Sequence, residues 1–283
     1  MQIVKTIKEV REIVTDWKKQ GLTIGFVPTM GYLHEGHQSL IKRSTENDRT
    51  VVSIFVNPIQ FGPNEDFASY PRDLERDTKK CEEAGADLIF APSDSEMYAD
   101  DFSTYVDMTG PTDELCGLKR PGHFKGVCTV VSKLFNIVTP DRAYFGQKDA
   151  QQLAVIKRMV RDLSIGVEIV GCPIIREADG LAKSSRNTYL SEDERKAAVV
   201  ISKALETGRK MIENGEKSAE TLIAKITELI QSEPLAKIDY IKAVDADSIV
   251  PVSNLDGNVL VAAAVYIGKT RLIDNFISEG SEK

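Results

Sequence analysis

The sequence predicts an α/β protein in which a Rossmann-like parallel sheet, with helices on both faces, precedes a smaller α+β domain. Up to residue 175, short apolar runs alternate with segments of helical spacing. Runs such as 51–56 are almost continuously apolar, as strands buried on both faces should be. Two helical segments and then several strand patterns follow, which predicts a C-terminal antiparallel sheet. We therefore expect two domains, 1–176 and 177–283.

In the first domain, the apolar runs predict strands at 24–27, 51–56, 88–91 and 167–175. The segments between them predict helices at 36–46, 73–84, 125–138 and 149–163. Strands that alternate with helices imply right-handed crossovers and a mainly parallel sheet, in which ligands bind beyond the carboxyl ends of the strands. Three polar segments follow strands or a short apolar stretch: 28–37, 57–62 and 146–149. We expect them to converge on one edge of the sheet.

In the second domain, a polar segment at 176–189 leads to predicted helices at 191–214 and 218–232. Ser191 and Glu194 form a capping-box pattern at the first helix start. Strands are predicted at 238–244, 248–252, 259–267 and 271–277, with Asp256-Gly257 as a turn signal. The segment at 176–189 contains the basic sequence KSSR, and we expect it to close over a ligand.

Composition excludes several classes of protein. The net charge of −7 argues against nonspecific nucleic-acid binding, which needs a positive surface. The four cysteines, Cys81, Cys116, Cys128 and Cys172, form no CxxC pair and predict buried free thiols in a reducing compartment. No apolar run approaches the roughly 18 residues of a membrane span, and the N-terminus lacks a signal-peptide pattern. We expect a cytoplasmic protein that binds neither nucleic acid nor membranes.

The most informative motif is PTMGYLHEGH at 28–37, which is typical of a strand, a glycine-containing turn and a helix start. Such a turn directs backbone N–H groups and the positive end of a helix dipole at a bound anion. Two of the three histidines, His34 and His37, lie here, which favours a phosphate site. Their spacing also suits a metal pair on one helix face, and a purely structural turn is the third alternative.

Other candidate residues each have an ordinary alternative. The hydroxyls and cations of KSSR, 183–186, suit a triphosphate, or they form a plain basic loop. Lys148 is a phosphate candidate or an ion-pair partner of Asp149. His123 would contact phosphate or cap a helix. The amides of Gln60 and Gln152 suit hydroxyl and carboxylate oxygens, or they are surface groups.

Three familiar motifs are excluded. The sequence GKT at 268–270 resembles the end of a P-loop, but Ala263 occupies the position of the leading glycine, and strands flank it. We predict a hairpin turn there. No GxGxxG fingerprint and no GxSxG elbow occur, which argues against an NAD site and a serine hydrolase.

Taken together, the motifs resemble those of the pantothenate synthetase (pantoate–β-alanine ligase) family, within the HIGH-motif nucleotidyltransferase superfamily. The matching segments are 28–37, 55–61, 70–72, 120–124, 146–152, 183–187 and 267–275. They occur in order over nearly the whole chain. The HEGH sequence alone would indicate only the superfamily, whereas 57–61 and 146–152 indicate the family.

The resemblance implies an ATP-dependent ligation in two steps. The (R)-pantoate carboxylate attacks the α-phosphate of ATP, which gives pantoyl adenylate and pyrophosphate. The amine of β-alanine then releases pantothenate and AMP. The resemblance also implies Mg²⁺ and a homodimer. Two alternatives stay open: a related nucleotidyltransferase that uses another acid, and a non-catalytic ATP-binding protein.

The resemblance further implies residue roles. Catalysis is expected from His37 (also as proton donor), His34, Lys148 and Arg186. Residues expected to bind ATP are Met30, Gly31, Tyr32, Leu33, His34, Glu35, Gly36, His37, Gly146, Gln147, Lys148, Asp149, Ile175, Lys183, Ser184, Ser185 and Arg186. Residues expected to bind pantoate or β-alanine are Gln60, Gln152, Asn57 and His123. Asp77 is expected to position Mg²⁺, mainly through phosphates and water. Two positions depart from the family pattern: Lys183 replaces a methionine and Gln147 a glutamate.

Overall fold

The computed structural model describes residues 1–63 and 65–278. Contacts within the chain divide it into two compact units. The first unit comprises Met1–Met108, Arg120–Gln147 and Val155–Pro173, and the second comprises Thr109–Lys119, Lys148–Ala154 and Ile174–Lys283. The domain boundary expected after residue 176 stays a prediction; the chain enters the second unit for the last time at Ile174.

The first unit is built on a parallel sheet of six strands in the order β1-β4-β3-β2-β5-β6. The strands are β1 (Gln2–Val4), β2 (Ile24–Thr29), β3 (Arg49–Ile54), β4 (Leu88–Phe90), β5 (Arg142–Gly146) and β6 (Glu168–Cys172). In the register of the central strands, Phe26 lies opposite both Val51 and Ala143. The predicted parallel sheet is therefore confirmed, and the short apolar stretch at 143–145 is one of its strands.

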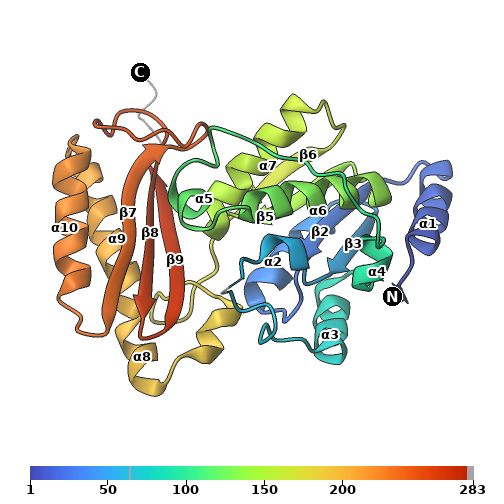
Figure 1. The fold of residues 1–283 in the computed structure, drawn as a ribbon, viewed down its shortest axis with the longest axis horizontal. Coiled ribbons are helices and arrows are strands. Elements are labelled where there is room, and N and C mark those ends of the chain that lie inside the picture. The colour runs from blue at the N-terminus through green and yellow to red at the C-terminus, as the bar shows by residue number, and fades with distance from the viewer. Residues whose placement is uncertain (64, 279–283) are drawn as a thin grey trace. The chain divides into compact units, whose positions relative to one another are not determined.

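Helices cover both faces of this sheet. The helices of the unit are α1 (Ile7–Lys19), α2 (Glu35–Ser44), α3 (Leu74–Ala84), α4 (Asp94–Met97) and α6 (His123–Val138), and α7 (Ala150–Asp162) passes from the second unit into the first (Figure 1). Short 3-10 turns lie at η1 (Pro58–Gln60) and η2 (Gln147–Asp149). Val27 of β2 packs in one cluster with Leu40 and Cys81. The neighbouring Phe26 ring lies 6.3 Å from that of Phe135 on α6. Alternate side chains of β2 thus face two cores, as predicted.

The second unit contains an antiparallel sheet in the order β7-β8-β9. Its elements are α5 (Leu115–Lys119), η3 (Ser185–Tyr189), α8 (Glu192–Ala197), α9 (Val199–Glu213), α10 (Ala219–Gln231), β7 (Ala236–Asp245), β8 (Val259–Ile267) and β9 (Thr270–Ser278). Helices α9 and α10 share one apolar core with the sheet (Figure 1). Ile267 pairs with Thr270, so Gly268 and Lys269 form a two-residue hairpin turn, which confirms the prediction for GKT.

Two predicted elements of the second unit are wrong in detail. The single helix expected at 191–214 is α8 followed by α9, because the Ala198 carbonyl accepts a tight i+3 hydrogen bond from the Ile201 N–H (3.2 Å). The strand expected at 248–252 is instead a turn. Ile249 has a φ of 60°, and Asp245 accepts hydrogen bonds from the Ser248 N–H and hydroxyl. Only an isolated bridge between Val244 and Pro251 remains there.

Smaller features complete the comparison with the sequence. Strand β1 and helix α1 were not among the expected elements, although Thr6 and Glu9 form a capping box at the start of α1. The Ser191–Glu194 capping box is confirmed. All four cysteines are free and buried, as predicted. None of the helices in the described part of the chain is long and apolar enough to span a membrane.

Candidate active site

The candidate site of the first unit lies at the point where the strand order reverses. From β2, the chain adds β3 and β4 on one side and β5 and β6 on the other. The segments after β2, β3 and β5 are the turn at 30–34, η1 with Asn57, and Gly146-Gln147. These three segments end adjacent parallel strands, so their predicted convergence is confirmed within this unit. Such reversal points are where open α/β sheets bind ligands.

Asp77 on α3 fixes the backbone of the turn between β2 and α2. Its Oδ2 accepts from the Tyr32 N–H and its Oδ1 from the Leu33 N–H, both at 2.7 Å. The side chain is 1% exposed, and this burial raises the pKa of Asp77. Gly31 has a φ of +82°, and a Cβ there would lie 2.9 Å from Asp77 Oδ2. Asp77 therefore serves the turn structurally, and its contact with Mg²⁺ stays a prediction.

The two histidines cap α2. His34 Nδ1 accepts from the Gly36 N–H (3.1 Å), and His37 Nδ1 accepts from the His34 N–H (3.3 Å). The ring centroids lie 4.1 Å apart. Because both Nδ1 atoms accept, each neutral ring carries its hydrogen on Nε2. Two N–H donors thus accompany a helix N-terminus, an arrangement suited to an anion. No group of three or more metal-binding side chains occurs among the described residues. Phosphate binding by this pair stays a prediction.

Gln60 is held in place on both sides of its side-chain amide. Its Oε1 accepts from Asn57 Nδ2 (3.0 Å), and its Nε2 donates to Met30 Sδ (3.2 Å). Asn57 is 1% exposed and also accepts from the Tyr98 hydroxyl (2.7 Å). Asn57 thus supports Gln60, a role the sequence did not indicate. Gly126 lets α6 approach this segment closely, since a Cβ there would lie 2.5 Å from Gln60 Cα.

His123 is buried and contacts the backbone of Gln60. Arg120 Nη1 donates to His123 Nε2 (3.0 Å), so Nδ1 carries the hydrogen and donates to the Gln60 carbonyl (3.0 Å). His123 is the first residue of α6, whose N-cap is Gly122. The structure thus gives His123 a supporting contact that neither expected alternative described. Direct contact with substrate stays a prediction.

In the second unit, Lys148 and Asp149 lie in η2, directly before α7. The Lys148 carbonyl accepts from Asn275 Nδ2 on β9 (2.8 Å). Lys148 Nζ lies 3.9 Å from Asp149 Oδ2, so the expected ion pair is present, although long. Asn275 is 4% exposed; the sequence indicated its segment but not this contact.

Two adjacent glutamines on α7 differ in their surroundings. Gln151 is buried and bonds to three backbone groups of 111–116. Gln152 is half-buried, and its contact with a ligand stays a prediction.

The loop from Ile175 to Arg186 combines local contacts with a long-range ion pair, because Arg176 Nη1 and Nη2 donate to the buried Asp274 carboxylate on β9 (2.7 and 3.0 Å). The Lys183 N–H donates to the Ile175 carbonyl (2.9 Å), and Lys183 pairs with Glu177 (2.9 Å). The Ser184 hydroxyl caps η3 by accepting from the Arg186 N–H (3.3 Å). Ser185 and Arg186 are the first residues of η3. Serine hydroxyls and a cation at such a turn can bind phosphate oxygens.

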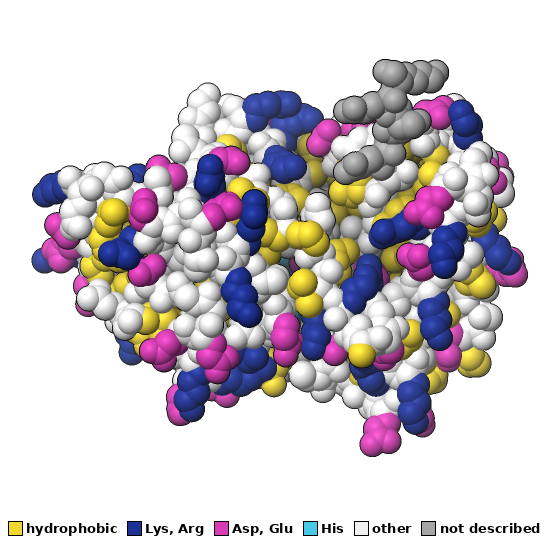
Figure 2. Space-filling view, turned by 180° about the vertical axis from the view of Figure 1, so that it is seen from behind, with side chains coloured by type: hydrophobic (Ala, Val, Ile, Leu, Met, Phe, Trp, Pro, Cys, Tyr) yellow, Lys and Arg dark blue, Asp and Glu magenta, His cyan; other side chains and the backbone are white. Residues whose placement is uncertain are grey.

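The charge on one face of the molecule is mixed. On the face in Figure 2, Lys and Arg side chains lie interspersed with Asp and Glu. Mixed charge of this kind is typical of solvated helix faces.

Comparison with known proteins gives a consistent result. The sequence model of the family described as pantoate-beta-alanine ligase matches residues 2–277. A pantothenate synthetase of Ruminiclostridium cellulolyticum is 64% identical over 276 residues, which cover 98% of each chain. The crystal structure of pantothenate synthetase from Thermus thermophilus matches with a TM-score of 0.91 and 46% identity, over 98% of this chain and 99% of that one.

A third match is the structure of a complex with ligands. The pantoate-beta-alanine ligase of Francisella tularensis, complexed with beta-gamma ATP and beta-alanine, matches with a TM-score of 0.79 and 38% identity. The alignment covers 98% of this chain and 97% of that one. The chain therefore belongs to the pantoate–β-alanine ligase family.

Proposed function

We propose that this chain joins (R)-pantoate to β-alanine with ATP, through a pantoyl adenylate, and releases AMP and pyrophosphate. The full-length family match supports the activity. The observation that carries the mechanism is the pair of His34 and His37 at the N-terminus of α2, after the central strand β2. A nucleotide's phosphates fit this donor set.

In the first step, a pantoate carboxylate oxygen attacks the α-phosphorus, and the bond to the bridging oxygen breaks. The electron pair leaves with pyrophosphate. His34 and His37 would donate their Nε2 hydrogens to phosphate oxygens, with Lys148 and Arg186 adding positive charge. Catalysis is then positioning and charge stabilisation, without an enzyme nucleophile.

Residues at the edges of the site would hold the remaining groups. Gln60 and Gln152 would bind pantoate, with Gln60 held ready by Asn57 and His123. In the second step, the β-alanine amine attacks the acyl carbon and AMP leaves. The remaining ATP contacts would come from the other residues predicted above. Those are Met30, Gly31, Tyr32, Leu33, Glu35, Gly36, Gly146, Gln147, Asp149, Ile175, Lys183, Ser184 and Ser185.

Mg²⁺ would enter as the ATP complex. Both carboxylate oxygens of Asp77 already accept backbone N–H groups, and no three-residue metal cluster occurs in the described ranges. These contacts favour a cation held by phosphates and water, which is common for Mg²⁺. We also propose a homodimer in the cytoplasm; light scattering on the purified protein tests the dimer.

The first test is ATP–pyrophosphate exchange with Mg²⁺ and D-pantoate, in the absence of β-alanine. We expect exchange that depends on pantoate, because the adenylate forms before the amine attacks. Addition of β-alanine should then produce AMP and pantothenate in equal amounts.

Other results would favour the alternatives. Exchange with a different acid but not with pantoate would indicate a related nucleotidyltransferase. ATP binding without exchange, and without AMP formation after β-alanine is added, would indicate a non-catalytic nucleotide-binding protein. Either result would overturn the proposed function.

A further inference from the structure

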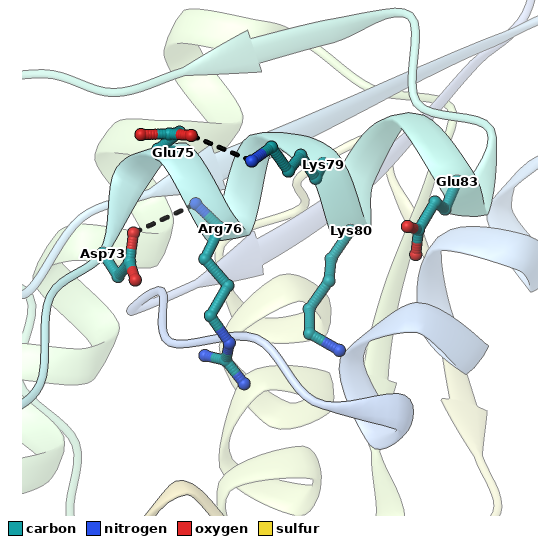
Figure 3. A pocket seen from close by; sticks show the side chains of 6 residues that line it. All are labelled: Asp73, Glu75, Arg76, Lys79, Lys80 and Glu83. Atoms are coloured by element: carbon teal, nitrogen blue, oxygen red, sulfur yellow. Dashed lines mark hydrogen bonds and ion pairs between the residues drawn. The ribbon is translucent and has the colours of Figure 1, made fainter.

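Helix α3 carries a hollow of about 390 Å³ that takes no part in the proposed reaction steps. Six charged residues of α3 and its N-cap line it: Asp73, Glu75, Arg76, Lys79, Lys80 and Glu83 (Figure 3). The same helix supplies Asp77, which holds the turn that leads to His34. The hollow therefore belongs to the same unit as the paired histidines.

The acidic groups of the hollow already have partners. Glu75 pairs with Lys79 (2.8 Å), and Asp73 caps α3 by accepting from the Arg76 N–H (3.0 Å). Glu83 accepts from Gln38 Nε2 on α2 (3.2 Å). Within the described residues, by contrast, no ion pair joins the side chain of Arg76 or of Lys80 to a carboxylate. The hollow thus keeps two cationic groups with no carboxylate of a described residue within ion-pair distance, although the charge of Arg76 also acts on the Asp77 carboxylate.

Arg76 is held in a definite place. Its guanidinium carbon lies 4.4 Å from the centre of the Tyr32 ring, and Asp77 fixes the backbone of Tyr32. Arg76 Nη1 is buried, and no described residue accepts a hydrogen bond from it. A buried donor without an acceptor is unfavourable and is commonly explained by a water or ligand. This group therefore points to an acceptor that the protein itself does not supply.

Lys80 extends the same positive surface. It lies four residues after Arg76, and in Figure 3 both side chains project from one side of α3 toward the segment between β2 and α2. A backbone contact agrees with this direction, since Gln38 on α2 donates to the Lys80 carbonyl (3.3 Å). Lys79 instead turns to Glu75.

We propose that Arg76 and Lys80 bind the terminal phosphates of the nucleotide, which leave as pyrophosphate. This proposal rests on the proposed function, because it takes ATP as the substrate. The arginine fork and the lysine point charge suit a multiply charged phosphate chain. As negative charge moves onto the departing pyrophosphate, two fixed cations stabilise it more strongly than in the ground state. The histidines would then serve the phosphates nearer the reacting atom.

The test is calorimetric binding of ATP, pyrophosphate and AMP to the full-length protein and its variants. Arg76→Ala should weaken the binding of ATP and of pyrophosphate at least about 10-fold, as expected for a lost hydrogen bond to a charged group. AMP, which lacks the terminal phosphates, should bind unchanged. Lys80→Ala should have the same pattern with a smaller loss. Lys79→Ala removes an equal charge from the same helix and should change none of the three affinities.

Further variants separate the proposal from a structural role. Arg76→Lys should recover part of the pyrophosphate affinity, whereas Arg76→Gln, which keeps a planar polar group over Tyr32, should not. If Arg76→Ala and Arg76→Gln weakened the binding of AMP as much as the binding of ATP and pyrophosphate, Arg76 would only support the turn. Unchanged pyrophosphate affinity in all Arg76 and Lys80 variants would overturn the proposal. Pantoate-dependent exchange by the unmodified enzyme tests the proposed function separately.

Discussion

The two units hold their candidate ligand-binding residues by different means. In the first unit, buried polar side chains fix the backbone across long stretches of sequence, as Asp77 does for Leu33 and His123 for Gln60. In the second unit, Lys183 and Ser184 are held by local bonds, whereas Arg176 and Lys148 are held by Asp274 and Asn275 of β9. Long-range buried networks open only with much of the fold, whereas locally bonded loops open at a lower free energy. The first unit thus offers a preorganised site, and the second combines long-range contacts from β9 with a locally held segment at Lys183 and Ser184.

The strongest challenge to the preorganised site is His37→Ala. We expect turnover to fall by about 10²-fold or more, as for other positioned donors to developing charge. The variant also loses the acceptor of the His34 N–H, which should lower the free energy of unfolding by about 1 kcal/mol. Steady-state kinetics and thermal unfolding measure the two effects.

Lys42→Ala is the matched control, since it alters an exposed residue of α2 without removing an imidazole. Its turnover should stay close to that of the unmodified protein. If the His37→Ala variant had the same turnover as the unmodified protein, His37 would not be a catalytic residue.

A second way to break the preorganised site is Gly126→Ala. The new Cβ would lie 2.5 Å from both Gln60 Cα and the Ile59 carbonyl oxygen, so the backbone must shift. We expect a loss of roughly 1–3 kcal/mol in the free energy of unfolding, as for other overpacked sites. The KM for pantoate should rise several-fold more than the KM for ATP.

Gly166→Ala is the control for this substitution, because a Cβ there meets no atom within 4 Å. It should leave stability and both KM values unchanged. If Gly126→Ala raised both KM values equally, Gln60 would not be specific to pantoate.

This contrast also explains what the sequence could predict. Apolar runs such as 51–56 and the motif at 28–37 carry their own signals, so the parallel sheet and the position of His34 were predictable. The contacts of Asp77 and His123 depend on pairings 44 and 63 residues apart, which periodicity does not encode. The error at 248–252 has a local cause, because the Asp245 side chain competes with strand pairing there.

The long-range contact in the second unit can be tested with Asn275→Ala. The Lys148 carbonyl would lose its hydrogen bond from Asn275 Nδ2, so Lys148 would be less well positioned. A net loss near 1 kcal/mol corresponds to about a fivefold rise in the KM for ATP, measured with pantoate saturating. Asn254→Ala changes an exposed asparagine of the same unit and should have no effect. A fall in thermal stability with an unchanged KM for ATP would mean that Asn275 acts only on the fold.

The cysteines distinguish the units by a smaller effect, on thiol reactivity. In the first unit, burial raises the pKa of Cys81 and of Cys128 to about 12, and burial also raises the pKa of Cys172. At pH 8, a thiol with a pKa of about 12 is thiolate in roughly one molecule in 10⁴. Since the thiolate is the nucleophile, these three should not react with maleimide in the folded protein.

Cys116 of the second unit has different neighbours. Its Sγ lies 3.7 Å from Nη1 and Nη2 of Arg271 and 3.2 Å from the Tyr240 hydroxyl. Cys116 is 9% exposed, whereas Cys81 and Cys128 are 0% exposed, so Cys116 should be modified first, and Cys116→Ser should abolish that phase. Mass spectrometry of the labelled, undenatured protein identifies the site. If Cys81, Cys128 or Cys172 were labelled at a rate similar to that of Cys116, the core of the first unit would open as readily as the region around Cys116. That result would contradict a preorganised first unit.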